Sequence, residues 1–330
     1  SEIEAADVPI AARMVPPADA APAVVSGDLL SRLPALLAAE DADALLLLGD
    51  RHEMLAAAQA AMLARLPILH IGGGYITRGA IDDGIRHAIT KLSGWHLVAN
   101  ETCAQRVRQL GEPEGRIRVV GAPDLDMVVR SKPGDGGALL ADVGLDPDRP
   151  FLLVTIHPET ASPPTEAAVL EVFDALGADA RQILITAPAP DPGAEVIWQG
   201  IEQLKTVRQG VRFVHSLGEK RYLQALHHAA AVVGNSSSGI LEASVLPVPV
   251  INIGRRQEGR EAAANVVNCG WSGAALAQEL GACEARRKVL QQSPPVSPYG
   301  DGQTSQHILN WLREMDVGKL SAVKAFVEIL

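Results

Sequence analysis

The sequence lacks the features of disulfide-rich, zinc-binding and membrane-spanning proteins. Only three of its 330 residues are cysteines, and Cys103, Cys269 and Cys283 lie far apart without a CxxC pair. We therefore expect neither a disulfide framework nor a metal site, and we expect a reducing compartment. Apolar runs such as Ala44 to Leu48 are far shorter than the roughly 20 residues of a membrane span. No signal peptide is recognisable, so the expected location is cytoplasmic.

Positive charge is also scarce. The chain has 29 Lys and Arg against 39 Asp and Glu, a formal net charge of −10, and no basic run. Because binding to nucleic acid depends on clustered cations, we do not expect a nucleic-acid partner. No cofactor is predicted either. The 47% hydrophobic composition and the length of the chain are sufficient for two domains with sizeable cores.

The most informative stretch is LHIGGGYITRGAIDDGIRHAITKL, residues 69–92. Its three glycines, of which Gly73 and Gly74 are candidate binding residues, follow an apolar strand and would let the backbone approach a ligand. Polar residues at helical spacing then share one face and could converge on a substrate. These residues are Asp82, Asp83, Arg86 and His87. The structural alternative is a tight turn followed by charges that suit a helix N-terminus.

A second informative segment is GNSSSGILE, residues 234–242. Three serines, Ser236, Ser237 and Ser238, and then Gly239 follow a predicted strand and precede a predicted helix from Ile240. Hydroxyl and backbone N–H groups at a helix start can hold a diphosphate without lysine. The alternative is a serine N-cap with a flexible loop.

Single polar residues at predicted strand ends complete the candidate set. His157 directly follows a buried strand and precedes a proline, which favours a functional position over a packed one. Asp50, in LLGDRHEM, could act as a base, orient a substrate hydroxyl or cap the next helix. Arg256 and Arg260 in GRRQEGR could contact a diphosphate or the other domain, or could be surface charges, and Gln257 lies between them.

Short apolar strands alternate with helices, which predicts α/β domains with doubly wound parallel sheets and ligands at the strands' carboxyl ends. We predict a first domain over 1–131, a second over 132–304 that begins at the linker KPGDGG, and a terminal helix within 305–330. The predicted strands are 44–48, 68–71, 96–99 and 117–120 in the first domain, and 151–156, 182–186, 212–214, 231–233 and 249–253 in the second.

These strings resemble, in order, those of the hydrolysing UDP-N-acetylglucosamine 2-epimerases. The matching family strings are Gly-Ala-Ile-Asp-Asp with Ile-Arg-His-Ala-Ile-Thr-Lys, Val-Thr-x-His-Pro, Gly-Asn-Ser-Ser-Ser-Gly-Ile, Gly-x-Arg-Gln-x-Gly-Arg and Pro-Tyr-Gly-Asp-Gly. The resemblance implies two Rossmann-like domains facing a cleft, the glycosyltransferase-B type, with the terminal helix crossing back to the first domain. It also implies a homodimer or higher homo-oligomer. The family's opening strand and Gly-Thr-Arg type loop have no counterpart in residues 1–27, so this unit is either missing from the sequence or lost.

The resemblance further implies a nucleotide-sugar substrate and a reaction. UDP is eliminated from UDP-N-acetylglucosamine, and the glycal is hydrated to N-acetylmannosamine for the synthesis of sialic-acid-like sugars. The serine loop would hold the diphosphate and Glu242 the ribose hydroxyls. The implied catalytic residues are Asp50, Asp82, Asp83, His157 and Tyr75, and the implied binding residues are Gly73, Gly74, Arg86, His87, Ser236, Ser237, Ser238, Gly239, Glu242, Arg256, Gln257 and Arg260.

The chain departs from the family pattern at four positions in this region. Gly72 and Tyr75 replace acidic or histidine groups, Arg78 replaces a glutamate, and Gly94 replaces a histidine. Three hypotheses therefore stand: a hydrolysing epimerase, a relative with other chemistry such as non-hydrolysing epimerisation or glycosyl transfer, and a non-catalytic binder. The sequence leaves open whether the nucleotide is uridine or guanosine.

Overall fold

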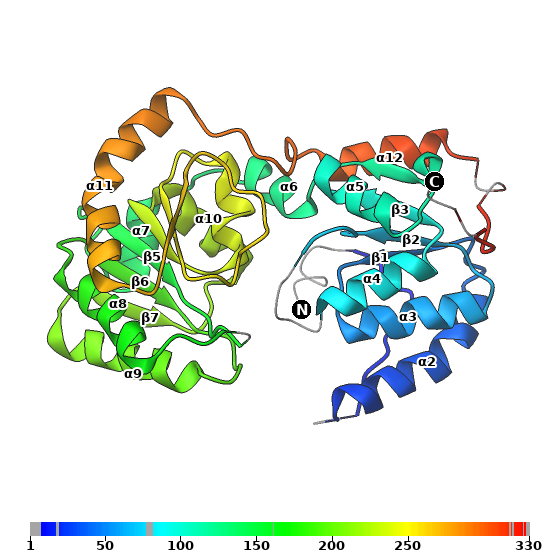
Figure 1. Cartoon of the computed structure of the whole chain (residues 1–330), viewed down its shortest axis with the longest axis horizontal. Helices are drawn as coiled ribbons and strands as arrows, with labels where there is room; N and C mark the ends of the chain where they lie inside the picture. Colours follow the sequence, from blue (N-terminus) through cyan, green and yellow to red (C-terminus); the bar gives the residue numbers. More distant parts are fainter. Residues whose placement is uncertain are drawn as a thin grey trace. The chain divides into compact units, whose positions relative to one another are not determined.

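The computed structural model describes residues 8–17, 20–76, 82–160, 162–316, 318, 320–325 and 327. Arg78 lies outside these residues. By its internal contacts the chain divides into two units (Figure 1). Of the described residues, the first holds the chain up to Tyr75, residues 82–120 and the segment from Gln306, whereas the second holds Gly121–Ser305. The domain limits at 131/132 and 304/305 stay predictions from the sequence.

The first unit is built on a four-stranded parallel sheet with the order β1-β2-β3-β4. Its strands are β1 (Leu45–Leu48), β2 (Ile68–Ile71), β3 (Trp95–Val98) and β4 (Ile117–Val119). Its helices are α2 (Pro22–Ala39), α3 (His52–Leu63), α4 (Asp82–Leu92), α5 (Glu101–Gln109) and the 3₁₀ turn η1 (Glu114–Arg116), with most of α12 (Thr304–Glu314).

Alternation along β2 explains how both faces of this sheet are covered. Ile68 packs with buried alanines of α3 and with Ile89 of α4, whereas Ile71 packs with Ile308 of α12. Because successive strand residues point to opposite faces, the apolar run of β2 supplies both cores. The alanines of α3 allow the helix to approach closely.

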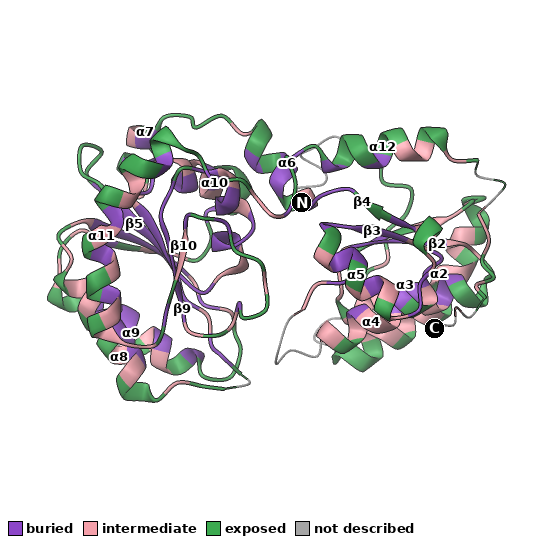
Figure 2. Ribbon diagram, turned by 45° about the horizontal axis from the view of Figure 1, so that its top comes forward, coloured by how far each residue is buried: buried purple, intermediate pink, exposed green. Residues whose placement is uncertain are grey.

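The second unit contains a six-stranded parallel sheet with the order β10-β9-β8-β5-β6-β7. Its strands are β5 (Phe151–Thr155), β6 (Gln182–Thr186), β7 (Val211–Val214), β8 (Ala231–Gly234), β9 (Val250–Ile253) and β10 (Val266–Cys269), and its helices are α6 (Pro123–Arg130), α7 (Gly136–Asp142), α8 (Glu166–Ala178), α9 (Ala194–Val207), α10 (Gly218–His228) and α11 (Gly273–Gln292). The strands β5, β6, β8 and β9 are buried throughout (Figure 2). The strand order reverses between β5 and β8, which makes that point the expected ligand position of a doubly wound sheet.

The predicted α/β class with parallel sheets is confirmed, and β2 and β6 have the predicted limits. The predicted α-helix from Ile240 is wrong. Two 3₁₀ turns stand there, η2 (Ser237–Gly239) and η3 (Glu242–Val245). Proline follows at 247 and again at 249, and because proline lacks an N–H and restricts the residue before it, the segment is too short for an α-helix. No helix in the described part of the chain is long and apolar enough to cross a membrane.

Candidate active site

The buried guanidinium of Arg86 is the centre of a charged cluster in the first unit. Its Nε donates to Asp50 Oδ2 at 2.9 Å and its Nη1 to Asp83 Oδ1 at 2.7 Å, and the Arg86 side chain is only 1% exposed. Asp50 follows β1, whereas Asp83 precedes Arg86 by three residues on α4 and therefore shares its helix face. A buried cation bound by two carboxylates is compensated, and it holds both carboxylates in place.

The other predicted residues of α4 take different positions. Asp82 is the first residue of α4, and the ring of His87 lies beside Asp83, with 3.5 Å between Nε2 and Oδ2. The carbonyl oxygen of Tyr75 accepts a hydrogen bond from Arg86 Nη1 at 2.8 Å. Tyr75 therefore helps to fix the cluster through its backbone, while a catalytic role of its phenol stays a prediction.

Two of the three glycines in the turn after β2 need a conformation that favours glycine. Gly74 has φ +83°, and a Cβ there would lie 2.3 Å from the carbonyl oxygen of Cys103. Gly72 has φ +97°, and a Cβ there would make only ordinary contacts, at 3.9 Å from the backbone nitrogen of Gly49 and from the Tyr75 ring. Close packing of the backbone therefore explains Gly74 without a ligand, and the binding roles of Gly73 and Gly74 stay predictions.

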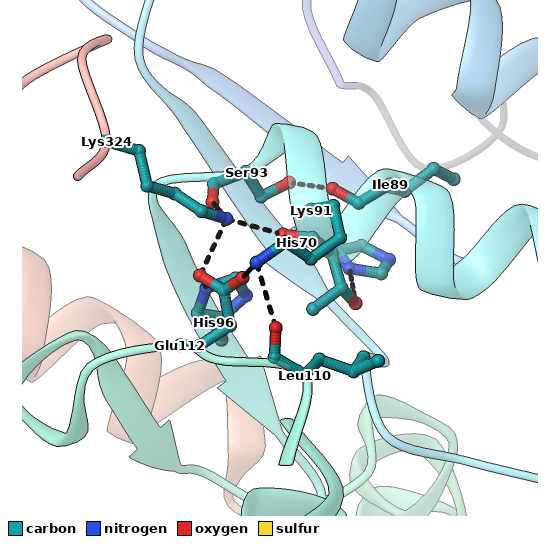
Figure 3. A network of polar contacts seen from close by, with 9 residues as sticks. His70, Ile89, Lys91, Ser93, His96, Leu110, Glu112 and Lys324 are labelled. Atoms are coloured by element: carbon teal, nitrogen blue, oxygen red, sulfur yellow. Dashed lines mark hydrogen bonds and ion pairs between the residues drawn. The ribbon is translucent and has the colours of Figure 1, made fainter. Parts of the chain in front are cut away.

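Sequence reasoning missed a network of polar contacts in the first unit (Figure 3). His70 Nε2 lies 2.9 Å from the carbonyl oxygen of Gly49, so the ring donates to the residue that precedes Asp50. Burial lowers the pKa of His70 to about 4, which keeps the ring neutral. His96, one strand away, hydrogen-bonds Glu112 at 2.9 Å. The sequence feature that could have revealed this network is the presence of His70 and His96 within otherwise apolar strands.

Asn235 joins three strand ends in the second unit. Its Oδ1 accepts from the His157 N–H at 2.7 Å and its Nδ2 donates to the His157 carbonyl oxygen at 2.8 Å. Its own carbonyl oxygen accepts from Arg256 Nη1 at 3.1 Å and Gln257 Nε2 at 2.8 Å. The loops after β5, β8 and β9 therefore meet at this fully buried side chain. The position of Asn235 directly after a strand, in the GNSSSG string, was the available signal.

Glu159 holds the loop after β9, which contains Arg255 and Arg256, through backbone hydrogen bonds. Its Oε1 accepts the N–H groups of Arg255 and Arg256 at 2.6 and 2.9 Å, and the residue is only 7% exposed. When two successive N–H groups donate to one carboxylate, they restrict the conformation of the loop. Glu159 was not predicted, although it follows His157 by two residues.

The serine loop differs from the predicted anion site. Ser238 Oγ hydrogen-bonds Tyr222 Oη and Ser236 Oγ, so its hydroxyl is engaged in the protein. Ser236 accepts from the Ser238 N–H as the cap of a 3₁₀ turn. Ser237 is half-buried and remains the best placed hydroxyl for a ligand. Because no α-helix starts here, the favourable field of a helix N-terminus is absent.

Glu242 carries a buried carboxyl oxygen in the second unit. Its Oε2 is buried and has no hydrogen-bond partner among the described residues. Burial, together with the charge of Asp124, raises its pKa to about 7, and Arg260 opposes that shift. Buried polar atoms are normally paired, so this oxygen indicates a ligand that supplies donors.

The predicted site residues therefore form two groups. The cluster of Asp50, Asp83 and Arg86 lies in the first unit, and the group joined by Asn235, with His157, Arg256 and Gln257, lies in the second. No group of histidine, cysteine or acidic side chains suitable for a metal ion is found among the described residues.

Comparison with known proteins agrees with this architecture. The family model described as UDP-N-acetylglucosamine 2-epimerase matches residues 6–313. The chain is 34% identical to the UDP-N,N'-diacetylbacillosamine 2-epimerase (hydrolyzing) of Legionella pneumophila over 275 residues, 83% of this chain and 71% of that protein. It is 31% identical to the UDP-N-acetylglucosamine 2-epimerase of Neisseria meningitidis over 293 residues, 87% of this chain and 75% of that protein.

Solved structures show the same fold. The N. meningitidis UDP-GlcNAc 2-epimerase bound to UDP-GlcNAc aligns with a TM-score of 0.74 over 90% of this chain and 83% of that chain, at 16% identity. The S. aureus MnaA-UDP co-structure aligns with a TM-score of 0.74 over 94% of this chain and 85% of that chain, at 17% identity. The predicted glycosyltransferase-B type fold class and the family resemblance are both confirmed, and the chain belongs to the UDP-N-acetylglucosamine 2-epimerase family.

Proposed function

We propose that this protein is a hydrolysing 2-epimerase that converts UDP-N-acetylglucosamine and water to N-acetylmannosamine and UDP. A base removes the C2 proton, the bond from C1 to the diphosphate oxygen breaks, and its electron pair leaves with UDP as C1 and C2 become doubly bonded. Water then adds its hydroxyl to C1, and a proton returns to the opposite face of C2. No external oxidant or reductant is needed.

The observation that best supports this proposed reaction is the cluster of Asp50, Asp83 and Arg86. Elimination needs a carboxylate held at a fixed position to act as the base. The positive charge of the buried Arg86 guanidinium favours the negative form of both carboxylates, and its hydrogen bonds hold them in place. We assign proton removal and water orientation to these two carboxylates. Tyr75 is a weaker candidate for the base, because a phenol is almost fully protonated near neutral pH.

The second unit supplies groups suited to the nucleotide. Ser237 and Arg256 offer donors for a diphosphate, and Glu242, whose Oε2 has no partner in the part of the chain that the structure describes, suits the two hydroxyls of a ribose. Loss of the Ser237 hydroxyl by Ser237→Ala is expected to weaken UDP binding by about 1 to 3 kcal/mol, the range for hydrogen bonds to charged groups. A homo-oligomeric state and a cytoplasmic location stay predictions.

A second candidate substrate is UDP-N,N'-diacetylbacillosamine. It is favoured by the 34% identical relative from L. pneumophila, whose name states that activity. The chemistry at C1 and C2 would be the same, and only the substituent at C4 and the group at C6 of the sugar would differ.

The test is to incubate the protein with each sugar nucleotide and to measure free UDP and the released sugar. Release of both from either substrate supports hydrolytic epimerisation. A UDP-linked epimer would indicate non-hydrolysing chemistry, and binding without turnover would indicate a binder; either would overturn the proposal. Asp83→Asn is expected to lower turnover by about a hundred- to ten-thousandfold with UDP affinity retained. Asp43→Asn, at an exposed position of the same unit, is the matched control.

A further inference from the structure

A backbone hydrogen bond determines which nitrogen of the His157 ring carries the proton. The N–H of Ala189, in the loop after β6, points at His157 Nδ1 with 2.9 Å between the nitrogens. A backbone N–H can only donate, so Nδ1 must accept with its lone pair. The proton of the neutral ring therefore lies on Nε2.

The surroundings keep this ring neutral and hold it in place. Burial lowers the pKa of His157 to about 4, the charge of Arg256 lowers it further, and Asp191 opposes the shift. Asn235 binds both the N–H and the carbonyl oxygen of His157. Among the described residues, Nε2 has no hydrogen-bond partner, and the side chain is only partly buried. The Nε2–H is thus available to a ligand.

We propose that Ala189 is a positioning residue whose N–H fixes His157 as a neutral Nε2–H donor, and that this donor binds the oxygen of the leaving diphosphate. The inference rests on the proposed function and deepens it. When the C1–O bond breaks, the electron pair moves to that oxygen, and the Nε2 proton stays on the ring as a hydrogen-bond donor. The C2 proton goes to a carboxylate. His157 is therefore neither the base nor a proton carrier. The family resemblance in the sequence, by contrast, places it among the catalytic residues together with the aspartates.

The first measurement is histidine nitrogen NMR of the full chain, with and without UDP, between pH 6 and 8. The His157 signals are identified by their loss in His157→Gln. We expect a bare Nδ1, a protonated Nε2, no titration in this range, and a shift of the Nε2 signals when UDP binds. A protonated Nδ1, titration near the ordinary histidine pKa, or an unchanged Nε2 signal with UDP bound would each refute the proposal.

Ala189→Pro removes the N–H, whereas Ala189→Gly keeps it. We expect the proline variant to show a mixture of the two ring tautomers and the glycine variant to show the wild-type tautomer alone. The same single tautomer in a folded proline variant would remove Ala189 from this role. Should the proline variant not fold, the wild-type and glycine spectra still decide which nitrogen carries the proton.

The pair His157→Gln and His157→Asn tests the donor position. The amide nitrogen of glutamine reaches approximately the place of Nε2, whereas that of asparagine lies near Nδ1. We expect glutamine to retain at least about tenfold more turnover than asparagine, since loss of one such donor costs about 10² to 10³ in kcat. Equal loss in both variants would contradict a donor role. If the wild type releases no UDP, the proposed function fails by itself, and the NMR shift with UDP still tests the donor.

Discussion

Lys324 and Glu112 form an ion pair inside the first unit, with 2.6 Å between Nζ and Oε2 (Figure 3). The same ammonium donates to the carbonyl oxygens of Thr90 and Ser93 at 3.1 and 2.9 Å. Thr90 lies in the last turn of α4 and Ser93 directly follows the helix, a position where carbonyl groups lack the usual helical partners; the Thr90 oxygen also accepts the Ser93 N–H at 3.3 Å. A residue near the end of the sequence therefore caps the helix whose first turn carries Asp83.

Replacing Lys324 by methionine is expected to lower the free energy of unfolding by about 1 to 3 kcal/mol, the cost of unsatisfied buried acceptors. Glu112 would keep Lys91 and His96 as partners, so the loss should stay below that of an entirely unpaired charge. Urea unfolding of Lys324→Met measures it. The exposed Lys220 provides the control Lys220→Met, and equal stability of the two variants would show that the cap contributes nothing.

Glu112 makes stability depend on acid pH. Burial favours its neutral form, but hydrogen bonds from His96, Lys324 and Lys91 outweigh burial and lower its pKa to about 2 from the ordinary value of 4.5. The unfolded chain therefore binds the proton more readily between these values. The contribution, about 3 kcal/mol at 1.36 kcal/mol per pH unit, is complete above pH 4.5 and is lost as the pH falls toward 2. Glu112→Gln should flatten this part of the curve of unfolding free energy against pH, and a parallel curve would contradict the assignment.

The raised pKa of Glu242 leads us to predict that ribose binding strengthens as the pH rises. Its pKa of about 7 means that the carboxyl is mostly neutral at pH 6 and mostly ionised at pH 8, and only the ionised form accepts two hydroxyl donors. Uridine affinity should therefore rise about tenfold from pH 6 to 8. Calorimetry with uridine, which has no phosphate to titrate, measures this. Glu242→Gln should bind weakly at every pH, and the same slope in that variant would assign the dependence to another group.

Two glycines near the cluster give opposite predictions for the same substitution. Gly74→Ala places a Cβ 2.3 Å from the Cys103 carbonyl oxygen at φ +83° and is expected to destabilise the protein by more than about 2 kcal/mol. Gly84→Ala, at an exposed position of α4 with open space around it, should stabilise it by about 0.5 to 1 kcal/mol. Thermal unfolding of both variants checks the pair. A tolerated Gly74→Ala would mean that the turn can shift away from Cys103.

Local patterns in the sequence determined many of the elements and some of the site, although the strand β10 and the helices α8, α9 and α11 were not predicted. The mostly apolar sequences of β2 and β6 predicted two buried strands, because a parallel strand covered on both faces is apolar at most positions; the polar residues among them, such as His70, are hydrogen-bonded. The spacing of Asp83 and Arg86 determined their contact, since residues three apart share a helix face. The prediction of a helix from Ile240 was wrong because the downstream prolines limit the segment to short 3₁₀ turns.

Only the tertiary structure decided the contacts between distant segments. Arg86 and Asp50 are 36 residues apart, and Asn235 and His157 are 78 apart. Asn235 and His157 meet because the parallel strands β5 and β8 bring their carboxyl ends to one edge of a sheet, whereas Arg86 reaches Asp50 from helix α4, which packs on the sheet. The proton position on His157 depends on an alanine whose side chain carries no chemical signal. A backbone N–H is common to every residue except proline, so its role arises from where the folded chain places it and cannot be read from the residue type.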